Sequence, residues 1–323
     1  MKPVKIIKNR SDIGAGTRGS DMGIDALEIA AINAGNNFFN RFPYLDVMTH
    51  NESVYDKVNV QFAKRITHVV EQCSRVSDAV KTTLDEGHFP IMLSGDHSSA
   101  LGALSGVKAH DPAKRLGVVW IDAHADLHSP YTTPSGNVHG MPLAAALAID
   151  NLDHRVNEVS SVSVRQWEKL KQIGTPEQKV KPEDLIFFGV RDTEAPEERL
   201  MRDLGIRNYK VEEMRYRGME TCLKEALQQL SDCDNIYISF DVDSLDCDLI
   251  SKGTGTPVSK GFDPEEVKLI IERLIHSGKV ACLEVTEINP LLDNKGNKMA
   301  ETAFQVLNAV TRHLVPEGLV VEG

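Results

Sequence analysis

Side chains that can bind a metal ion are concentrated in one stretch of the sequence, which begins at Trp120. Asp122, His124 and Asp126 occur at every second position, directly after the apolar run 116–121. In extended backbone, alternate side chains share one face and lie roughly 6–7 Å apart along the chain. This spacing predicts that the three side chains project from the end of a strand toward one point.

Two further clusters follow other apolar runs. Asp241 and Asp243 come directly after the run 236–240, and His97 follows the run 91–93 by a few residues. An acidic loop at the end of a strand would explain one such cluster, but it does not explain three. Three predicted strands that each end in Asp or His therefore indicate a shared metal site.

The predicted ligands are two histidines and four aspartates, namely His97, His124, Asp122, Asp126, Asp241 and Asp243. A structural zinc ion prefers Cys and His in a closed tetrahedron, so this oxygen-rich set argues against a lone structural zinc. Carboxylates with some imidazole suit Mn²⁺ or a related hard divalent ion, and six ligands suit two ions. Paired ions roughly 3.5–4 Å apart can lower the pKa of a shared water toward neutrality, which gives a nucleophile for hydrolysis.

The elements that must position these ligands alternate along the chain. Strands are predicted at 4–7, 45–48, 91–93, 116–121, 185–188, 206–210, 236–240 and 280–285. Helices are predicted at 24–34, 58–86, 100–109, 142–149, 164–173, 197–204, 220–230, 264–277 and 301–313. This alternation is typical of an α/β fold in which a mostly parallel, roughly eight-stranded sheet has helices on both faces.

We expect a single domain that spans residues 1–323, because no internal repeat or low-complexity segment divides the chain. The polar segment 151–182 contains one predicted helix and is expected to lie outside the sheet. Ligands of open α/β sheets bind at the carboxyl ends of the strands. His97, Asp122, Asp241 and Glu287 each follow a predicted strand, so they are expected to converge at one edge.

Composition excludes several classes of function. The formal net charge is −11 and no basic block offsets it, which argues against nucleic acid or an anionic membrane as a partner. No apolar run approaches the roughly 18 residues of a membrane span, and the first residues do not resemble a signal peptide. Five scattered cysteines without a Cys-x-x-Cys motif indicate a reducing compartment. The sequence therefore predicts a cytoplasmic protein.

A glycine-rich turn near the N-terminus nominally matches the dinucleotide fingerprint. Gly14, Gly16 and Gly19 have the spacing G-x-G-x-x-G. The predicted strand ends several residues before this turn, however, and the predicted helix begins too late after it. We therefore do not expect a nucleotide site here.

The three metal clusters resemble the metal motifs of the arginase–agmatinase (ureohydrolase) family, in the same order and at similar spacing. The motifs are Ser94-Gly95-Asp96-His97-Ser98, Asp122-Ala123-His124-Ala125-Asp126 and Ser239-Phe240-Asp241-Val242-Asp243-Ser244-Leu245-Asp246. The resemblance covers nearly the whole chain. Three more segments resemble arginases more than agmatinases: Ser135-Gly136-Asn137-Val138-His139-Gly140, Gly253-Thr254-Gly255-Thr256-Pro257-Val258 and Glu287-Ile288-Asn289-Pro290.

The resemblance implies a hydrolase with two Mn²⁺ ions per chain and a metal-bridging hydroxide that attacks a guanidinium carbon. The substrate it most strongly suggests is L-arginine, which would give L-ornithine and urea. One ion would be held by His97, Asp122, Asp126 and Asp241, and the other by Asp122, His124, Asp241 and Asp243.

Three residues have implied catalytic roles. Asp126 would steady the hydroxide and pass its proton to the leaving amine. His139 would act as a proton shuttle, and Glu287 would orient the guanidinium group.

The implied substrate-binding residues are His128, Thr133, Ser135, Asn137, Glu194, Glu197 and Thr256. Family arginases usually carry Asn at the position of His128, on the loop that reads the α-carboxylate. They usually carry Asp at the position of Glu194, near the α-amino group. These two departures leave agmatine or another guanidino compound open as the substrate. The resemblance also implies a homo-oligomer, either a trimer or a hexamer.

Two other classes of function are less consistent with these motifs. A single-zinc amidohydrolase of the deacetylase type shares the general architecture, but it does not need the complete second set of ligands found here. A sensor or scaffold without activity would be expected to lack a ligand or the histidine at position 139, and both are present.

Overall fold

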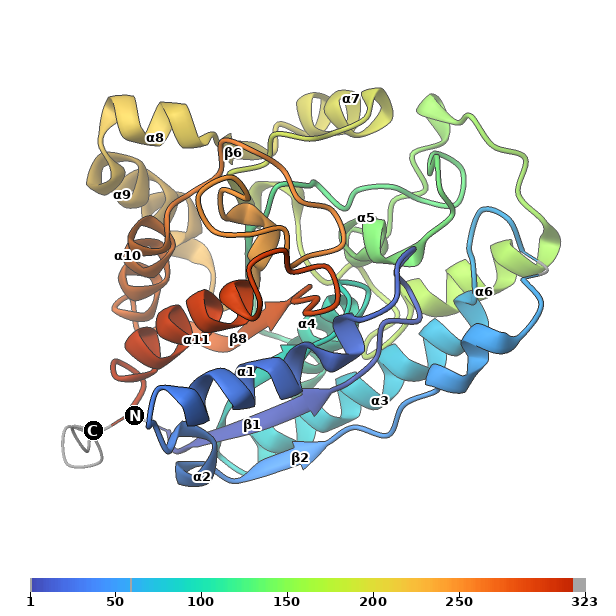
Figure 1. The fold of residues 1–323 in the computed structure, drawn as a ribbon. Helices are drawn as coiled ribbons and strands as arrows, with labels where there is room; N and C mark the ends of the chain where they lie inside the picture. The colour runs from blue at the N-terminus through green and yellow to red at the C-terminus, as the bar shows by residue number, and fades with distance from the viewer. Residues whose placement is uncertain (1, 59, 316–323) are drawn as a thin grey trace.

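The apolar strands form one sheet at the centre of the molecule (Figure 1). The computed structural model describes residues 2–58 and 60–315, and within these residues the sheet has eight strands. They are β1 (Val4–Asn9), β2 (Tyr44–Asp46), β3 (Phe89–Ser94), β4 (Leu116–Ile121), β5 (Leu185–Phe188), β6 (Arg207–Tyr209), β7 (Asn235–Asp241) and β8 (Val280–Thr286). Their order is β2-β1-β3-β8-β7-β4-β5-β6, and each pairing is parallel.

Helices cover both faces of the sheet, as a parallel sheet requires. One face packs against α1 (Gly23–Asn33), α2 (Phe38–Arg41), α8 (Val211–Arg217), α9 (Met219–Gln229), α10 (Pro264–Ile275) and α11 (Lys298–Thr311). The other packs against α3 (Ile66–Asp85), α4 (Ser99–His110), α5 (Pro142–Ala146), α6 (Ser161–Lys171) and α7 (Ala195–Leu204).

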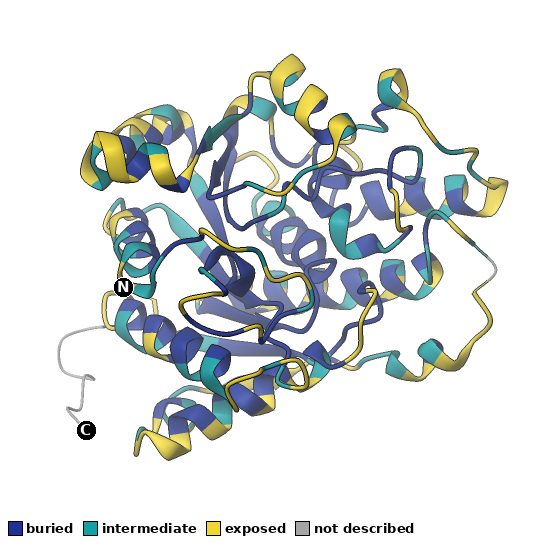
Figure 2. Ribbon diagram, turned by 45° about the horizontal axis from the view of Figure 1, so that its top comes forward, coloured by how far each residue is buried: buried dark blue, intermediate teal, exposed yellow. Residues whose placement is uncertain are grey.

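Strand β4 shows why the sheet needs two covering layers. All six of its residues are buried. Val118 and Trp120 belong to one hydrophobic core, whereas Val119 and Ile121 belong to the core on the opposite face. Figure 2 shows the same arrangement for the whole molecule, with buried strands in the centre and exposed residues on the outer sides of the helices.

The predicted fold class is confirmed, and each predicted strand is present. Strands β4 and β5 have the predicted bounds, and the ends of the other strands differ by at most two residues. The predicted helix 58–86 begins only at Ile66, because Arg65 adopts the left-handed conformation with a φ of 54°. Residue 59 lies outside the described residues. The short helices α2 and α8 were not predicted. Helix α8 is separated from α9 by Gly218 alone, whose φ is 92°.

The four central strands β3, β8, β7 and β4 are neighbours and end at nearly the same level. Leu93 pairs with Val285, Val285 with Phe240, and Phe240 with Ile121. The segments that follow these strands therefore start side by side at the carboxyl edge of the sheet. Among the described residues, no helix is long and apolar enough to cross a membrane.

Candidate active site

The predicted site residues gather around one cavity of about 290 Å³ at the carboxyl edge of the sheet. Asp122 is fully buried, and its carboxylate lies against His97 of the cavity wall. The other predicted residues line the cavity: His97, His124, Asp126, His128, Thr133, Ser135, Asn137, His139, Glu194, Glu197, Asp241, Asp243, Thr256 and Glu287. Segments distant in the sequence thus meet at one place.

The first ligand group is centred on His97, which follows β3. Its Nδ1 atom lies 3.1 Å from the Oδ2 atoms of Asp122, Asp126 and Asp241. Nevertheless, within the described residues this Nδ1 atom and Oδ2 of Asp122 are buried and form no hydrogen bond. Buried polar atoms without a partner are uncommon in proteins. A cation placed among these atoms would satisfy them, so the residues fit a metal ion.

The second ligand group shares a member with the first. Nδ1 of His124 lies 3.0 Å from Oδ2 of Asp243 and 3.5 Å from Oδ1 of Asp122. Asp122 thus belongs to both groups of converging ligand atoms. Two ligand groups that share one carboxylate are suited to a pair of divalent ions.

The electrostatics of the cluster also favour cations. Burial and the neighbouring charges of Asp243 and Asp122 raise the pKa of Asp241 well above its ordinary value. Burial opposes protonation of His97, but the surrounding carboxylates raise the pKa of this imidazole well above its usual range. Several carboxylates held together away from water need positive charge nearby. Divalent cations would supply it.

Two residues that were not predicted as site residues orient His97. Ser239 lies with its Oγ atom 2.7 Å from Nε2 of His97. The indole ring of Trp120 stacks on the imidazole, with ring centroids 4.0 Å apart and an angle of 7° between the planes. The Ser239 contact at Nε2 leaves Nδ1 facing the carboxylates, and the stacked indole fixes the plane of the ring. The strand register could have indicated both Trp120 and Ser239, because these two residues pair on the neighbouring strands β4 and β7.

Asp126 and Glu287 have unusual backbone conformations. Their φ angles are 50° and 65°, in the left-handed region that residues other than glycine seldom adopt. Each such conformation costs about 1–3 kcal/mol and is found most often at functional sites. Backbone hydrogen bonds hold both residues in place, from Glu287 N to the carbonyl of Gly95 and from Leu143 N to the carbonyl of Asp126.

Glu287 and His139 form a pair on the cavity wall. Oε1 of Glu287 lies 3.0 Å from Nδ1 of His139 and also accepts a hydrogen bond from the backbone N–H of His97, at 2.9 Å. Burial disfavours the charged imidazole, but the carboxylate of Glu287 raises the pKa of His139 to about 9. The contact with Glu287 therefore favours the protonated form of this histidine.

The two departures from the family pattern contact each other. Nε2 of His128 lies 2.9 Å from Oε2 of Glu194 and 3.4 Å from Oε2 of Glu197. His128 is only 6% exposed, so it is not a solvent-facing loop residue. The hydrogen bond from His128 lowers the pKa of Glu194 to about 2, whereas burial raises the pKa of Glu197 to about 7.

The loop predicted to read the α-carboxylate is shaped by its own hydroxyl groups. Oγ1 of Thr133 accepts a hydrogen bond from the N–H of Gly136 at 2.9 Å, and Oγ of Ser135 accepts one from the N–H of Asn137 at 3.1 Å. Lys64, which the sequence did not indicate, donates to Oδ1 of Asn137 at 3.2 Å. These bonds give the cavity wall a defined form.

The glycine-rich turn of the N-terminal segment supports this wall. The N–H of Gly14 donates to Oδ2 of Asp96 and the N–H of Gly19 to Oδ2 of Asp12, each at 2.8 Å. A Cβ atom at Gly16 would lie only 2.4 Å from Nδ2 of Asn137. The amides of Gly14 and Gly19 are thus engaged by carboxylates.

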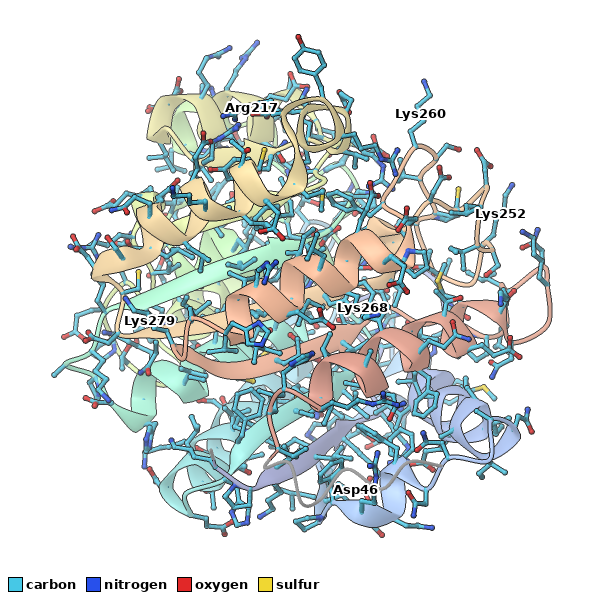
Figure 3. All side chains as sticks on the ribbon, turned by 90° about the vertical axis from the view of Figure 1, so that its left-hand side faces the viewer. Asp46, Arg217, Lys252, Lys260, Lys268 and Lys279 are labelled. Carbon is cyan, nitrogen blue, oxygen red and sulfur yellow. The ribbon has the colours of Figure 1, made fainter. Side chains whose placement is uncertain are left out.

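Two other segments complete the cavity. Thr256, on the loop between β7 and α10, donates a hydrogen bond from Oγ1 to Oδ2 of Asp243 at 2.9 Å. Lys252 and Lys260 of the same loop extend away from the molecule in Figure 3 and are exposed. Asp192 lines the cavity 3.7 Å from Nε2 of His124 and was not predicted, although it follows β5 as the predicted ligands follow their strands.

The fold and the site together define an α/β protein of the ureohydrolase type, with clustered His and Asp ligands at the carboxyl edge of a parallel sheet. The sequence model of the Arginase family matches residues 2–311. The chain belongs to the Arginase family.

Individual relatives agree with this assignment. The chain is 32% identical to the arginase of Bacillus subtilis over 311 residues. The matched region covers 96% of this chain and 97% of that protein. The chain is 33% identical to the arginase of Brevibacillus brevis, with 96% and 97% of the two chains covered. Among solved structures, the arginase of Bacillus caldovelox has a TM-score of 0.81 at 32% identity and covers 96% of this chain and 98% of that chain.

Proposed function

We propose that this protein is a binuclear manganese amidinohydrolase that hydrolyses L-arginine to L-ornithine and urea. The observation that carries the proposal is the shared Asp122, which joins two ligand groups beneath an acidic cavity. The names of the relatives, which are arginases, support the choice of substrate.

The ligand atoms support manganese as the metal. Carboxylate oxygens outnumber imidazole nitrogens in the cluster, and such sets suit a hard divalent ion. His97, Asp122, Asp126 and Asp241 would hold one ion, and Asp122, His124, Asp241 and Asp243 the other. When bound, the two ions would supply Lewis-acid chemistry and a water molecule acidic enough to act as a nucleophile near neutral pH.

The chain's own residues would bind the guanidinium group and move protons. Glu287 is a buried carboxylate at the cavity, and a carboxylate is the expected partner of a planar cation. Asp126 would hold a proton and pass it to the leaving amine. His139, already hydrogen-bonded to Glu287, would shuttle protons between the cavity and solvent.

The outer part of the cavity would recognise the α-groups of arginine. Thr133, Ser135, Asn137 and His128 would bind the α-carboxylate, and Glu194 and Glu197 would bind the α-amino group. Thr256 would help to place the guanidinium group through its hydrogen bond to Asp243.

We further propose that the whole chain forms a single catalytic domain that acts in the cytoplasm. The continuous sheet supports the first point, and five buried, unpaired cysteines support the second. A trimer or hexamer is proposed from the family resemblance, and light scattering of the purified protein would measure it.

The test of the proposed function is release of urea from L-arginine. Protein loaded with Mn²⁺ should release urea and ornithine in equal amounts, and protein stripped with a chelator should release neither until Mn²⁺ is returned. Loaded protein that leaves arginine intact would refute the proposal.

A further inference from the structure

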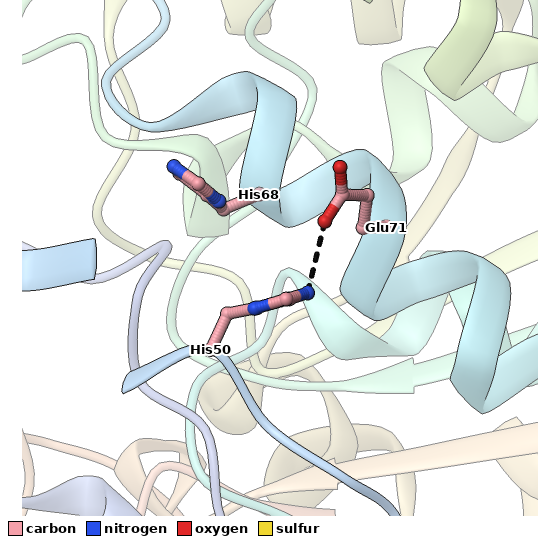
Figure 4. Close-up of side chains that lie close together, drawn as sticks. All are labelled: His50, His68 and Glu71. Carbon is pink, nitrogen blue, oxygen red and sulfur yellow. Dashed lines mark ion pairs between the residues drawn. The ribbon is translucent and has the colours of Figure 1, made fainter. Parts of the chain in front are cut away.

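A second cluster of metal-binding side chains lies at the start of α3. His50, from the loop after β2, meets His68 and Glu71 of α3 (Figure 4). Each of the three residues offers one ligand atom, and these atoms all lie within 4.8 Å of one another. We propose that this cluster binds a divalent transition-metal ion of the Zn²⁺ class, at a site separate from the candidate active site.

The helix presents two of the ligands together. His68 and Glu71 are three residues apart on α3, so their side chains share one face of the helix. Nε2 of His50 lies 2.9 Å from Oε2 of Glu71. The loop thus brings a third ligand to a pair that the helix already holds in place.

The imidazole rings are oriented as metal ligands are. Within the described residues, Nδ1 of His68 is buried and forms no hydrogen bond, and the buried Nε2 of His50 has its ion-pair contact with Glu71 but no hydrogen bond of normal geometry. The other nitrogen of each ring faces a carboxylate: Nδ1 of His50 is 3.7 Å from Glu52, and Nε2 of His68 is 3.5 Å from Asp56. Metal-bound histidines commonly donate their second N–H to a carboxylate, and in both rings here a carboxylate lies within 4 Å of that nitrogen. In the neutral tautomer that carries its N–H on the outer nitrogen, the inner nitrogen has a lone pair for the metal.

The ligand set differs from that of the candidate active site. Two imidazoles and one carboxylate are a known zinc set, with the fourth position left to water. Imidazole-rich sites suit Zn²⁺, whereas carboxylate-rich sites suit Mn²⁺. The two clusters therefore favour different ions.

The position of the cluster gives a bound ion a structural role. The segment between His50 and His68 includes Lys64, whose N–H donates to the carbonyl of Gly136 at 2.8 Å and whose Nζ donates to Asn137. An ion at this cluster would tie both ends of a segment that supports the cavity wall.

The test counts and locates Zn²⁺ in the Mn²⁺-loaded protein. After exposure to a small molar excess of Zn²⁺ and dialysis, we expect wild type to retain one Zn²⁺ per chain that His68→Ala and Glu71→Gln lose. His88→Ala is the control, because His88 is partly exposed and contacts Glu86 instead. His68 and Glu71 are 35% and 51% exposed in their side chains, so the variants should fold, which circular dichroism would verify.

Anomalous diffraction at the zinc edge then places the ion. A peak among His50, His68 and Glu71 supports the proposal. Equal zinc content in wild type and His68→Ala, or a zinc peak only beside His97 and His124, would overturn it. Neither result depends on whether arginine is the substrate, because no readout uses activity.

Discussion

His128 and Glu194 make a compensating pair at the mouth of the cavity. Where family arginases usually carry Asn and Asp, this chain carries an imidazole and a carboxylate that is longer by one methylene, and the two meet at 2.9 Å. The sequence showed each departure separately but not their contact, because the two residues come from different loops. Because the two side chains are in contact, the effect of one departure on substrate binding depends on the other.

A double-mutant cycle tests this pairing. His128→Asn and Glu194→Asp should each lower kcat/KM for arginine, because each leaves the other partner unmatched. The double variant, which restores the usual family pair, should be more active than the product of the two single effects predicts. Coupling of contacting residues is about 0.5–3 kcal/mol, and the exposure of Glu194 favours the lower end. Strictly additive effects would mean that the contact is unimportant.

Substitutions of Asp126 and Glu287 should affect metal content and activity differently. Asp126→Asn changes a predicted metal ligand, so metal content and kcat should fall together. Glu287→Ala leaves the ligand groups intact, so metal content should stay near that of wild type while activity falls by about 10² or more. Metal analysis and urea release on the same samples separate the two effects. If Glu287→Ala kept most of its activity, the proposed position of the guanidinium group would be wrong.

At the scale of elements, the strands were easier to predict than the helices. Strands β4 and β7 are buried on both faces, so each contains a largely apolar run that can be predicted from its own sequence alone. Helices α2 and α8 were missed because they are short and are held by packing instead of by a long periodic pattern. The start of α3 depends on the left-handed Arg65, which no residue preference indicates.

In the site, as in the fold, some residues could be predicted from the sequence and others could not. The ligands that follow the strands were all predicted to converge. Ser239, Trp120, Lys64 and Asp192 were missed, because their roles depend on strand register and on contacts between distant loops. Residue types at strand ends therefore predicted the chemistry, whereas the supporting contacts required the structure.

The loop at Gly136 offers a test of how the cavity wall is held. Gly136 has a φ of 77°, and a Cβ atom there would lie 1.9 Å from the carbonyl oxygen of Gln61. Gly136→Ala should displace the loop and raise KM for arginine about tenfold or more, with metal content unchanged. Gly35→Ala is the matched control, since its φ is 65° but no atom lies within 4 Å of the added Cβ. Equal KM values in both variants would exclude this role for the loop.

At the scale of the whole molecule, the predicted metal ligands lie at the ends of three central strands, β3, β4 and β7, so metal binding should be linked to stability. A ligand that binds only the folded state stabilises it by about 2.7 kcal/mol at a hundred times its Kd. Removal of Mn²⁺ should therefore lower the melting temperature by on the order of 5 °C. His97→Asn should show a smaller shift on metal removal than wild type. Identical melting curves with and without metal would contradict a buried site that joins these strands.

The most direct test of the central claim is a competition between L-arginine and agmatine for the Mn²⁺-loaded enzyme. Agmatine lacks the α-carboxylate that Thr133, Ser135 and Asn137 are proposed to bind. Hydrogen bonds to a charged group contribute roughly 1.5–3 kcal/mol each, and about 1.4 kcal/mol is a factor of ten. We predict that arginine exceeds agmatine at least about tenfold in kcat/KM. Turnover of agmatine equal to or faster than that of arginine would contradict the assignment of arginine as the substrate.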